Sequence, residues 1–396
     1  MINASNGHHA AFRQRLSRLG SVLFLAALHA HAQSLEDVPG VVVHQMPVPS
    51  AWDRFCGRAV YTASPSIVVT PKGDYLISSN PFGSGSEADI SGTTYIHRSV
   101  DKGATWHLLT TLRDMKRGSL FLLNEVLYIW GYTADPGSII IRRSNDGGQS
   151  WTTPTDEQNG LLRVGKFGGT PCIPAIHDGR LWLAQGGKRV MSTPVTADLL
   201  WAGAWTLSRA ANVKNGPLGA KLTVSEAQVV AAPHTGVVLL PKIGGHPYTV
   251  LLRVGDNPSK VRDPRPEDWV AFPGGEKKFG AIYDPVSETF YALSNPVLPE
   301  FASSGWRPEL IRNTLALLSS KNLRTWRIKR IVLQSPNVDY EAFQYPAFVI
   351  DGDDLLIALR TAYHIGGRKP PRGHDSNLIT FFRVQQFRSF PREQLP

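Results

Sequence analysis

The hydrophobic and polar positions of this chain follow the two-residue period of β-strands. Short runs rich in β-branched residues recur between turns containing Gly, Pro, Asn and Asp, and long stretches with a helical period are absent after residue 32. Clear examples are Ser66–Thr70, Ala227–Ala231, Val237–Leu240 and Ile331–Leu333. The pattern predicts an all-β protein.

A short motif occurs twice among these strands. Ser99–Trp106 and Ser144–Trp151 both read Ser-x-Asp-x-Gly-x-Thr/Ser-Trp, and the second copy starts 45 positions after the first. In such a turn Asp accepts hydrogen bonds from backbone amides, Gly tolerates positive φ, and Trp opens the returning strand. The motif residues are Ser99, Asp101, Gly103, Trp106, Ser144, Asp146, Gly148 and Trp151.

The repeat continues in a weaker form along the chain. Ser319–Trp326 keeps Ser, Thr and Trp but has Lys321 and Leu323 in place of Asp and Gly. The tryptophans at positions 106, 151, 205, 269 and 326 are 45 to 64 residues apart. A unit of this size holds about four short strands, as a propeller blade does. Five such units and a closing one predict a six-bladed β-propeller with blades of four antiparallel strands; a β-sandwich with two similar hairpins is the alternative.

The first 32 residues have the features of a signal peptide. A basic segment precedes an apolar run at Leu19–Leu28, and a small-x-small cleavage site ends at Ala32. The run is too short to span a bilayer, and no later segment is apolar enough to do so, so we expect export without membrane insertion.

The rest of the chain is expected to form one domain. Residues 33–50 form a lead-in that supplies the outer strand of the closing blade from Val41–His44. Residues 51–396 form the propeller, and Asn377–Val384 is expected to be its last inner strand. Pairing between the two ends would close the ring and remove an exposed sheet edge.

Composition narrows the possible ligands. The formal net charge is +10, and removal of residues 1–32 would leave +7, spread along the chain. This surplus suits an anionic glycan and equally an ordinary solvated surface. No basic stripe with interleaved aromatic residues is present, so nucleic acid is not an expected partner.

The cysteines and histidines point to no cofactor. Cys56 and Cys172 could form a disulfide in an oxidising compartment, although their separation does not show that they meet. The chain has no Cys/His cluster with zinc spacing, no glycine-rich phosphate loop and no calcium-loop pattern. We therefore predict neither a metal nor another cofactor; an ion held by scattered oxygen atoms of a propeller is the alternative.

Two such Ser-x-Asp motifs in an exported, six-unit β chain resemble the sialidase (neuraminidase) superfamily, over nearly the whole mature chain. There the motif is called an Asp-box; it is structural, lies away from the active site and also occurs in unrelated propellers, so it indicates fold more than activity. The chain is more similar to a less familiar bacterial branch of exported, sialidase-like proteins. The similar stretches are Ala63–Ser66, Phe272–Phe279 (which contains Lys278), Arg312–Leu317, Phe343–Tyr345 (which contains Gln344), Arg360–Tyr363 and His374–Asn377.

The resemblance implies three catalytic residues. Ser225–Val230 is similar to a sialidase strand reading Asn-Glu-Pro-Gln-Val-Val, which gives Glu226 the role of a base that assists the nucleophile. Phe343–Tyr345 resembles the segment that carries the nucleophilic tyrosine, Tyr345 here. A phenol with a pKa near 10 needs such a base. Asp89 lies in the interval where sialidases have their acid/base aspartate, with Glu87 nearby.

The resemblance also implies substrate-binding residues, with departures. Sialidases hold the substrate carboxylate with three arginines; Arg312 matches one, Lys242 stands in place of another, and Ala63 occupies the third position. Lysine keeps the charge but loses the planar two-pronged grip of arginine. Arg58 lies close in sequence to Ala63 and could compensate.

Further candidates for substrate binding lie in the last similar stretches. Arg360, His374 and Asp375 fall near strand ends, and Gln344 and Lys278 belong to the stretches given above. A histidine beside an aspartate suggests an oriented imidazole that moves protons near neutral pH; an exposed turn is the alternative.

These residues favour a glycoside hydrolase of exo-α-sialidase type that releases a terminal, acidic sugar. Two other functions stay open. One is a polysaccharide lyase in which Tyr345 or Tyr363 acts with His374, and the other is a glycan-binding propeller without catalysis. We expect a monomer whose partner is a glycan or glycoconjugate, an anionic one by preference.

Overall fold

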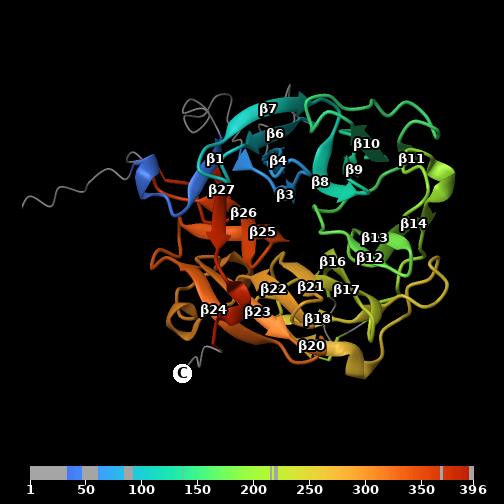
Figure 1. Ribbon diagram of the computed structural model, residues 1–396. Coiled ribbons are helices and arrows are strands. Elements are labelled where there is room, and N and C mark those ends of the chain that lie inside the picture. The colour runs from blue at the N-terminus through green and yellow to red at the C-terminus, as the bar shows by residue number, and fades with distance from the viewer. Residues whose placement is uncertain are drawn as a thin grey trace, which may run out of the picture. The chain divides into compact units, whose positions relative to one another are not determined.

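The computed structural model describes residues 34–46, 61–83, 92–135, 137–214, 216–217, 222–365 and 369–391, all within one compact unit spanning 33–396. It is an all-β, six-bladed propeller, as predicted, with its blades arranged in a ring (Figure 1). Within these ranges, helical structure is confined to three-residue 3-10 segments: η1 (Leu35–Asp37), η5 (Ala202–Ala204), η6 (Pro266–Asp268), η7 (Pro299–Phe301), η8 (Pro308–Leu310) and η9 (Phe387–Ser389).

The blades follow one another along the chain. Blade 1 contains β3 (Ser66–Val69), β4 (Tyr75–Ser79), β6 (Thr94–Ser99) and β7 (His107–Leu112). Blade 2 contains β8 (Lys116–Leu123), β9 (Val126–Tyr132), β10 (Ile139–Ser144) and β11 (Leu161–Arg163). Blade 3 contains β12 (Ala175–His177), β13 (Arg180–Gln185), β14 (Arg189–Pro194) and β15 (Thr206–Leu207).

The second half of the ring has the same plan, with a less regular fourth blade. Blade 4 contains β16 (Val224–Ala232), β17 (Gly236–Ile243) and β19 (Leu252–Arg253), accompanied by the paired strands β18 (Tyr248–Val250) and β20 (Trp269–Ala271). Blade 5 contains β21 (Gly280–Asp284), β22 (Thr289–Ser294), β23 (Thr314–Ser320) and β24 (Arg327–Gln334). Outside the blades, β2 (Tyr61–Thr62) pairs with β5 (Pro81–Phe82).

Blade 6 closes the ring with strands from both ends of the chain. Its order is β1-β27-β26-β25, with β1 (Val41–Gln45), β27 (Leu378–Val384), β26 (Asp354–Ala362) and β25 (Ala342–Asp351). The prediction of an outer strand at Val41–His44 is confirmed. The prediction that Asn377–Val384 is an inner strand is wrong, because β27 is third from the axis and pairs with β1. The N-terminal strand takes the outermost place, so the C-terminal segment supplies the three strands inside it.

The two Ser-x-Asp motifs form turns with the same hydrogen bonds. In the first, Thr105 N donates to Asp101 Oδ1 at 2.9 Å and Trp106 Nε1 donates to Gly103 O at 3.2 Å. The equivalent contacts of the second copy measure 2.9 Å each. Each motif therefore joins the third and fourth strands of its blade.

The third, degenerate copy forms a related turn with a different side chain. Asn322 Oδ1 accepts a bond from Thr325 N at 3.0 Å, and Trp326 Nε1 donates to Leu323 O at 2.9 Å. Leu323 has a φ of +63°, the left-handed conformation that glycine supplies elsewhere. The amide of Asn322 thus replaces the aspartate, one position after Lys321.

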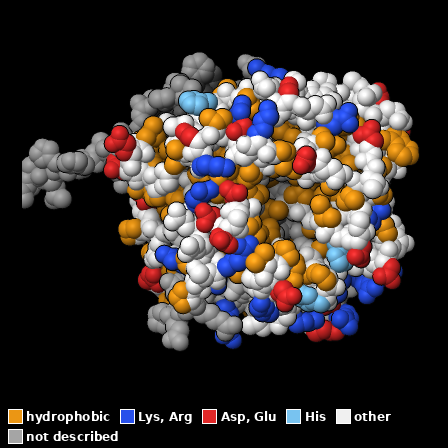
Figure 2. Space-filling view, in the orientation of Figure 1, with side chains coloured by type: hydrophobic (Ala, Val, Ile, Leu, Met, Phe, Trp, Pro, Cys, Tyr) orange, Lys and Arg blue, Asp and Glu red, His pale blue; other side chains and the backbone are white. Residues whose placement is uncertain are grey.

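The inner strands of the six blades alternate in length. β3, β12 and β21 have 4, 3 and 5 residues, whereas β8, β16 and β25 have 8, 9 and 10. Each long strand carries a β-bulge near its start. The middle of the ring is hollowed, with hydrophobic side chains around it (Figure 2). A cavity of about 590 Å³ there is lined by β12, β16, β21 and β25.

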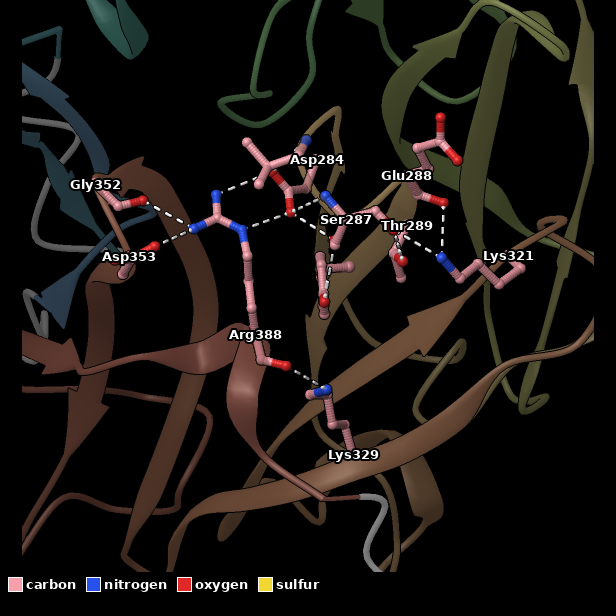
Figure 3. Close-up of polar contacts among 11 residues, drawn as sticks. Asp284, Ser287, Glu288, Thr289, Lys321, Lys329, Gly352, Asp353 and Arg388 are labelled. Carbon is pink, nitrogen blue, oxygen red and sulfur yellow. Dashed lines mark hydrogen bonds and ion pairs between the residues drawn. The ribbon is translucent and has the colours of Figure 1, made fainter.

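A polar clasp ties the end of the chain to blades 5 and 6 (Figure 3). Arg388 Nε and Nη2 donate to both carboxylate oxygens of Asp284 in β21, at 2.8 and 3.0 Å. Arg388 Nη1 donates to Gly352 O and Asp353 Oδ1 in the β25–β26 turn, at 3.0 and 2.9 Å. Burial opposes ionisation of Asp284, but the bonds from Arg388 and Ser287 outweigh it and lower its pKa to about 2.

Replacing Arg388 with methionine should destabilise the ring, because the carboxylate of Asp284 would stay buried without its partner. We expect the free energy of unfolding at pH 7 to fall by about 3 kcal/mol. Urea unfolding measures this loss. Arg327→Met, an exposed change on β24, is the matched control, and an equal loss in the two variants would contradict the clasp.

A half-buried histidine, His44, and a buried one, His97, lie at the seam between β1 and blade 1. The His44 and His97 rings are 4.7 Å apart, and His44 Nδ1 lies 3.3 Å from Ser79 Oγ. Burial lowers the pKa of His44 to about 4 and that of His97 to about 3, from 6.5. Both imidazoles are therefore neutral in the folded protein at neutral pH.

The neutral state of both imidazoles predicts that the folded protein loses stability in acid. Below pH 6.5 the unfolded chain binds protons that folded His44 and His97 do not, so stability falls as the pH drops from 6.5 towards 4. Urea unfolding at a series of pH values should show this slope, and His97→Leu should reduce it. The exposed change His107→Leu should leave it unaltered; the same slope in His97→Leu would refute the assignment.

Candidate active site

Tyr345 and Glu226 occupy equivalent places on two long inner strands. The pairing of β25 with β26 shifts register between Gln344 and Ala347, and that of β16 with β17 shifts between Ser225 and Gln228. At these bulges Tyr345 has a φ of +52° and Glu226 a φ of +51°. A bulge re-aims a side chain that regular alternation would place elsewhere. Both residues lie at the same end of their strands, next to the axis of the ring.

Two guanidinium groups lie beside the ring of Tyr345. The Arg312 guanidinium carbon is 5.6 Å from the ring centroid and that of Arg360 is 5.2 Å from it. Both arginines are almost fully buried, and Tyr345 is 8% exposed. These distances fall within the range of cation–π contact.

Gln344 holds Arg312 and the turn that contains His374 in place. Arg312 Nη1 donates to Gln344 Oε1 at 2.7 Å, and Arg312 Nε donates to Glu309 O at 2.9 Å. The amide of Gln344 donates to Gly373 O and to Ser376 Oγ, both at 2.7 Å. Gln344 therefore positions the guanidinium group of Arg312.

Arg360 contacts the same turn. Its Nη2 donates to His374 O at 2.6 Å, and His374 Nδ1 lies 2.7 Å from Asp375 Oδ1. Arg372 Nε donates to the other oxygen of Asp375 at 3.0 Å. Burial lowers the pKa of His374 to about 4 in spite of Asp375, so this imidazole is neutral at pH 7. Burial also lowers the pKa of Arg360, to about 10, which leaves it charged.

Glu226 is paired with Lys242 across blade 4. Ser225 faces Lys242 in the strand register, and Lys242 Nζ lies 2.6 Å from Glu226 Oε2. Burial opposes ionisation of Glu226, but Lys242, and then Arg312 and Lys278, outweigh it and lower its pKa. Glu226 is therefore a carboxylate at neutral pH, and its charge acts on Arg360 as well.

Two adjacent lysines from blade 5 are buried beside this group. Lys277 forms an ion pair with Glu276, and Lys278 Nζ donates to Pro346 O at 3.2 Å. Burial lowers the pKa of each lysine to about 8, so each stays mostly protonated at pH 7. Sequence reasoning included Lys278 but missed Lys277 and Glu276. The run of three charged residues between Phe272 and Phe279 is the signal that marks them.

The structure brings most of the predicted residues into one neighbourhood. Its members, linked by the contacts and charge interactions above, are Glu226, Lys242, Lys278, Arg312, Gln344, Tyr345, Arg360, His374 and Asp375. Ala63 is buried just before β3, and its amide donates to Asn80 O at 2.7 Å. Arg58, Glu87, Asp89 and Cys56 lie outside the described residues, so the acid and the compensating arginine stay predictions. Cys172 is a buried free thiol, so the possible disulfide is not formed in the structure.

In the part of the chain that the structure describes, no group of three or more His, Cys, Asp or Glu side chains is arranged to hold a metal ion. No helix in that part is long and apolar enough to cross a membrane.

Comparison with known proteins yields matches to structures alone. No family model matches the sequence, and no curated protein matches it. The α-L-arabinanase of Penicillium chrysogenum is similar with a TM-score of 0.53 and 13% identity, covering 89% of this chain and 99% of that one. The GH93 α-L-arabinofuranosidase of Fusarium graminearum gives 0.54 and 13%, covering 87% and 97%.

A sialidase is among the similar structures as well. Trypanosoma rangeli sialidase gives a TM-score of 0.51 and 13% identity, covering 83% of this chain and 55% of that one. At these identities the similarity establishes a fold. The chain is thus a six-bladed propeller of the sialidase-like kind, shared with arabinanase and arabinofuranosidase structures.

Replacing Lys242 with methionine should change the ionisation of Glu226. Without the ammonium group, the effect of burial is less opposed, and the pKa of Glu226 should rise. A ¹³C NMR titration of labelled glutamate side chains measures this pKa directly. Lys242→Arg, which keeps the charge, should preserve most of the lowering, and an unmoved pKa in Lys242→Met would contradict the pairing.

Proposed function

We propose that this protein is an exported glycoside hydrolase that releases a terminal, acidic sugar. The observation that carries the proposal is Tyr345 at the hub, with Arg312 and Arg360 beside its ring and an ionised Glu226 in the same group. A glycan substrate is supported by the similar structures, which are arabinan- and sialic-acid-acting hydrolases.

In the first step, the phenolic oxygen of Tyr345 attacks the anomeric carbon. Glu226 accepts the phenolic proton, which lets the nucleophile act without a free phenolate. The bond to the leaving group breaks, and its oxygen takes a proton from an acid, for which Asp89 remains the candidate. The product is a sugar joined to Tyr345, and tyrosine nucleophiles are a known exception to the two-carboxylate scheme.

In the second step, water replaces Tyr345 at the anomeric carbon. The acid that lost its proton in the first step now removes one from this water. Glu226 returns its proton to the departing phenolic oxygen, so both groups regain their starting states. The anomeric carbon undergoes two displacements, so its configuration is retained.

The charge of the site favours an acidic sugar over a neutral one. Arg312 bonds to the carbonyl and amide oxygens of Glu309 and Gln344, and Lys278 bonds to a carbonyl oxygen. These neutral partners do not cancel the two positive charges, which can therefore stabilise a substrate carboxylate. Ala63 and Lys242 stand where sialidases have arginines, so we propose an acidic sugar without restricting it to sialic acid.

One observation favours a second candidate, a polysaccharide lyase. His374 is a neutral imidazole at pH 7, is oriented by Asp375 and belongs to the turn that binds Arg360. With Tyr345 it could remove the proton next to a uronate carboxylate.

Lyase products absorb ultraviolet light through a new double bond, whereas hydrolysis gives reducing ends alone. Screening sialyl and uronyl glycosides by both readouts, with arabinobiose as the neutral comparison, distinguishes the two reactions.

Replacing Tyr345 with phenylalanine should remove hydrolysis while sparing binding. On a substrate found in that screen, we expect kcat to fall at least about 1,000-fold, because the attacking oxygen is lost. Affinity for the same glycoside should change little. Tyr340→Phe, at a surface tyrosine that bonds Lys369, is the control, and full turnover by Tyr345→Phe would disprove the nucleophile assignment.

A further inference from the structure

Arg117 occupies the same structural position as Glu226 and Tyr345. The pairing of β8 with β9 shifts register between Lys116 and Ser119, and Arg117 inside this bulge has a φ of +58°. Glu226 and Tyr345 have φ values of +51° and +52° in the matching bulges of β16 and β25. Each of the three long inner strands therefore presents one left-handed residue at its start.

The strand register confirms that the three positions are equivalent. The residue before each bulge residue pairs with the last part of the second strand: Lys116 with Tyr132, Ser225 with Lys242, and Gln344 with Arg360. In blades 4 and 6 the partner on the second strand is a cationic residue, Lys242 or Arg360. In blade 2 the partner is Tyr132, and the cationic residue is Arg117 in the bulge itself.

The order of the blades places these residues on three sides of the hub. Blades 2, 4 and 6 alternate around a six-bladed ring and are thus about 120° apart about its axis. Glu226 and Tyr345 supply two of the three sides. Arg117 supplies the third, at the same end of its strand.

The backbone conformation of Arg117 is one that disfavours a side chain. A left-handed backbone is unfavourable for a residue with a Cβ and costs about 1 kcal/mol, and such strain gathers at functional sites. Glycine at this position would relieve it. The following residue is a glycine: a Cβ on Gly118 would lie 2.5 Å from Ile129 Cδ1, so the bulge itself is tightly built.

The guanidinium of Arg117 is available to a ligand. Arg117 is exposed, and its Nη1 donates to Gly169 O of the neighbouring blade at 2.9 Å. That partner is a neutral carbonyl, so the positive charge is not cancelled by it. The loop that carries Gly169 packs closely against Tyr132, because a Cβ on Gly169 would lie 2.7 Å from Tyr132 Oη.

We propose that Arg117 binds a second anionic group of the substrate, a carboxylate or a sulfate ester, on the side of the hub facing Tyr345 and Glu226. This inference rests on the proposed function and narrows it. The substrate class becomes a glycan with two negative groups, one near Arg312 and Arg360 and the other at Arg117. A guanidinium suits either anion through paired hydrogen bonds.

Binding can be measured apart from catalysis in a Tyr345→Phe background. The probes are three disaccharides with the same terminal hexuronate: one linked to a plain hexosamine, one to a 6-O-sulfated hexosamine and one to a second hexuronate. We expect isothermal titration calorimetry to show about tenfold tighter binding for at least one dianionic probe. Adding Arg117→Gln should abolish this difference and leave the monoanionic probe unaffected. The sulfated and the double-hexuronate probes distinguish sulfate from carboxylate.

Two further variants keep the test specific. Arg117→Gly fits the left-handed backbone without strain, so it should fold at least as well as the parent and lose the same preference. Arg327→Gln removes one exposed charge on β24 and should keep the preference for the dianionic probe.

The outcomes separate this inference from the proposed function. Equal affinity for mono- and dianionic probes, or a preference that survives Arg117→Gln, overturns the Arg117 assignment alone. Binding with the expected preference but no hydrolysis by the parent chain overturns the proposed function alone. Binding of none of the acidic probes overturns both.

Discussion

The candidate site depends on one backbone constraint, the β-bulge at the start of each long inner strand. In a regular strand, consecutive side chains point to opposite faces, and both faces of an inner propeller strand pack against neighbouring blades. Gln228 and Gln344, which flank the bulges, are fully buried in this way. The extra residue at the bulge leaves the alternation and carries its side chain to the axis. Glu226 and Tyr345 reach the hub because the β-bulges interrupt the regular pairing of their strands with β17 and β26.

The second constraint is electrostatic. Burying several cations around one phenol is costly unless most of their charge is offset. Lys242 and Lys277 are offset by Glu226 and Glu276. Arg312 and Lys278 instead donate to neutral oxygens, which do not carry a charge to offset theirs. Such a surplus would be stabilised by an anion, which in the proposed function is supplied by the acidic sugar.

Much of the fold could be predicted from the sequence. Strand periodicity and the tryptophan spacing indicated the blades, and the N-terminal strand was placed correctly. The position of Asn377–Val384 could not be read in the same way, because an inner and a third strand carry similar apolar runs. The turn at Asn322 was missed because an amide replaced the aspartate one position away from the expected place.

The candidate site was less accessible to sequence reasoning. Individual residues such as Arg312 and Tyr345 could be named from family motifs, but a bulge depends on the register of the partner strand, which no single segment encodes. Arg117 therefore escaped notice, since it lies in no recognised motif. Lys277 was overlooked because a lysine reads as a surface residue until its burial is known.

The closure of the ring and the geometry of the hub are linked through blade 6. Tyr345 and Arg360 lie on β25 and β26, in the one blade built from both ends of the chain. The spacing of these two residues depends on β27 and β1, which form the outer half of the sheet. It also depends on Arg388, which joins the β25–β26 turn to blade 5. Rigid strands fix a site more closely than loops do. The Ser-x-Asp turns join the outer strands of their blades, whereas the bulges of the inner strands position Glu226, Tyr345 and Arg117.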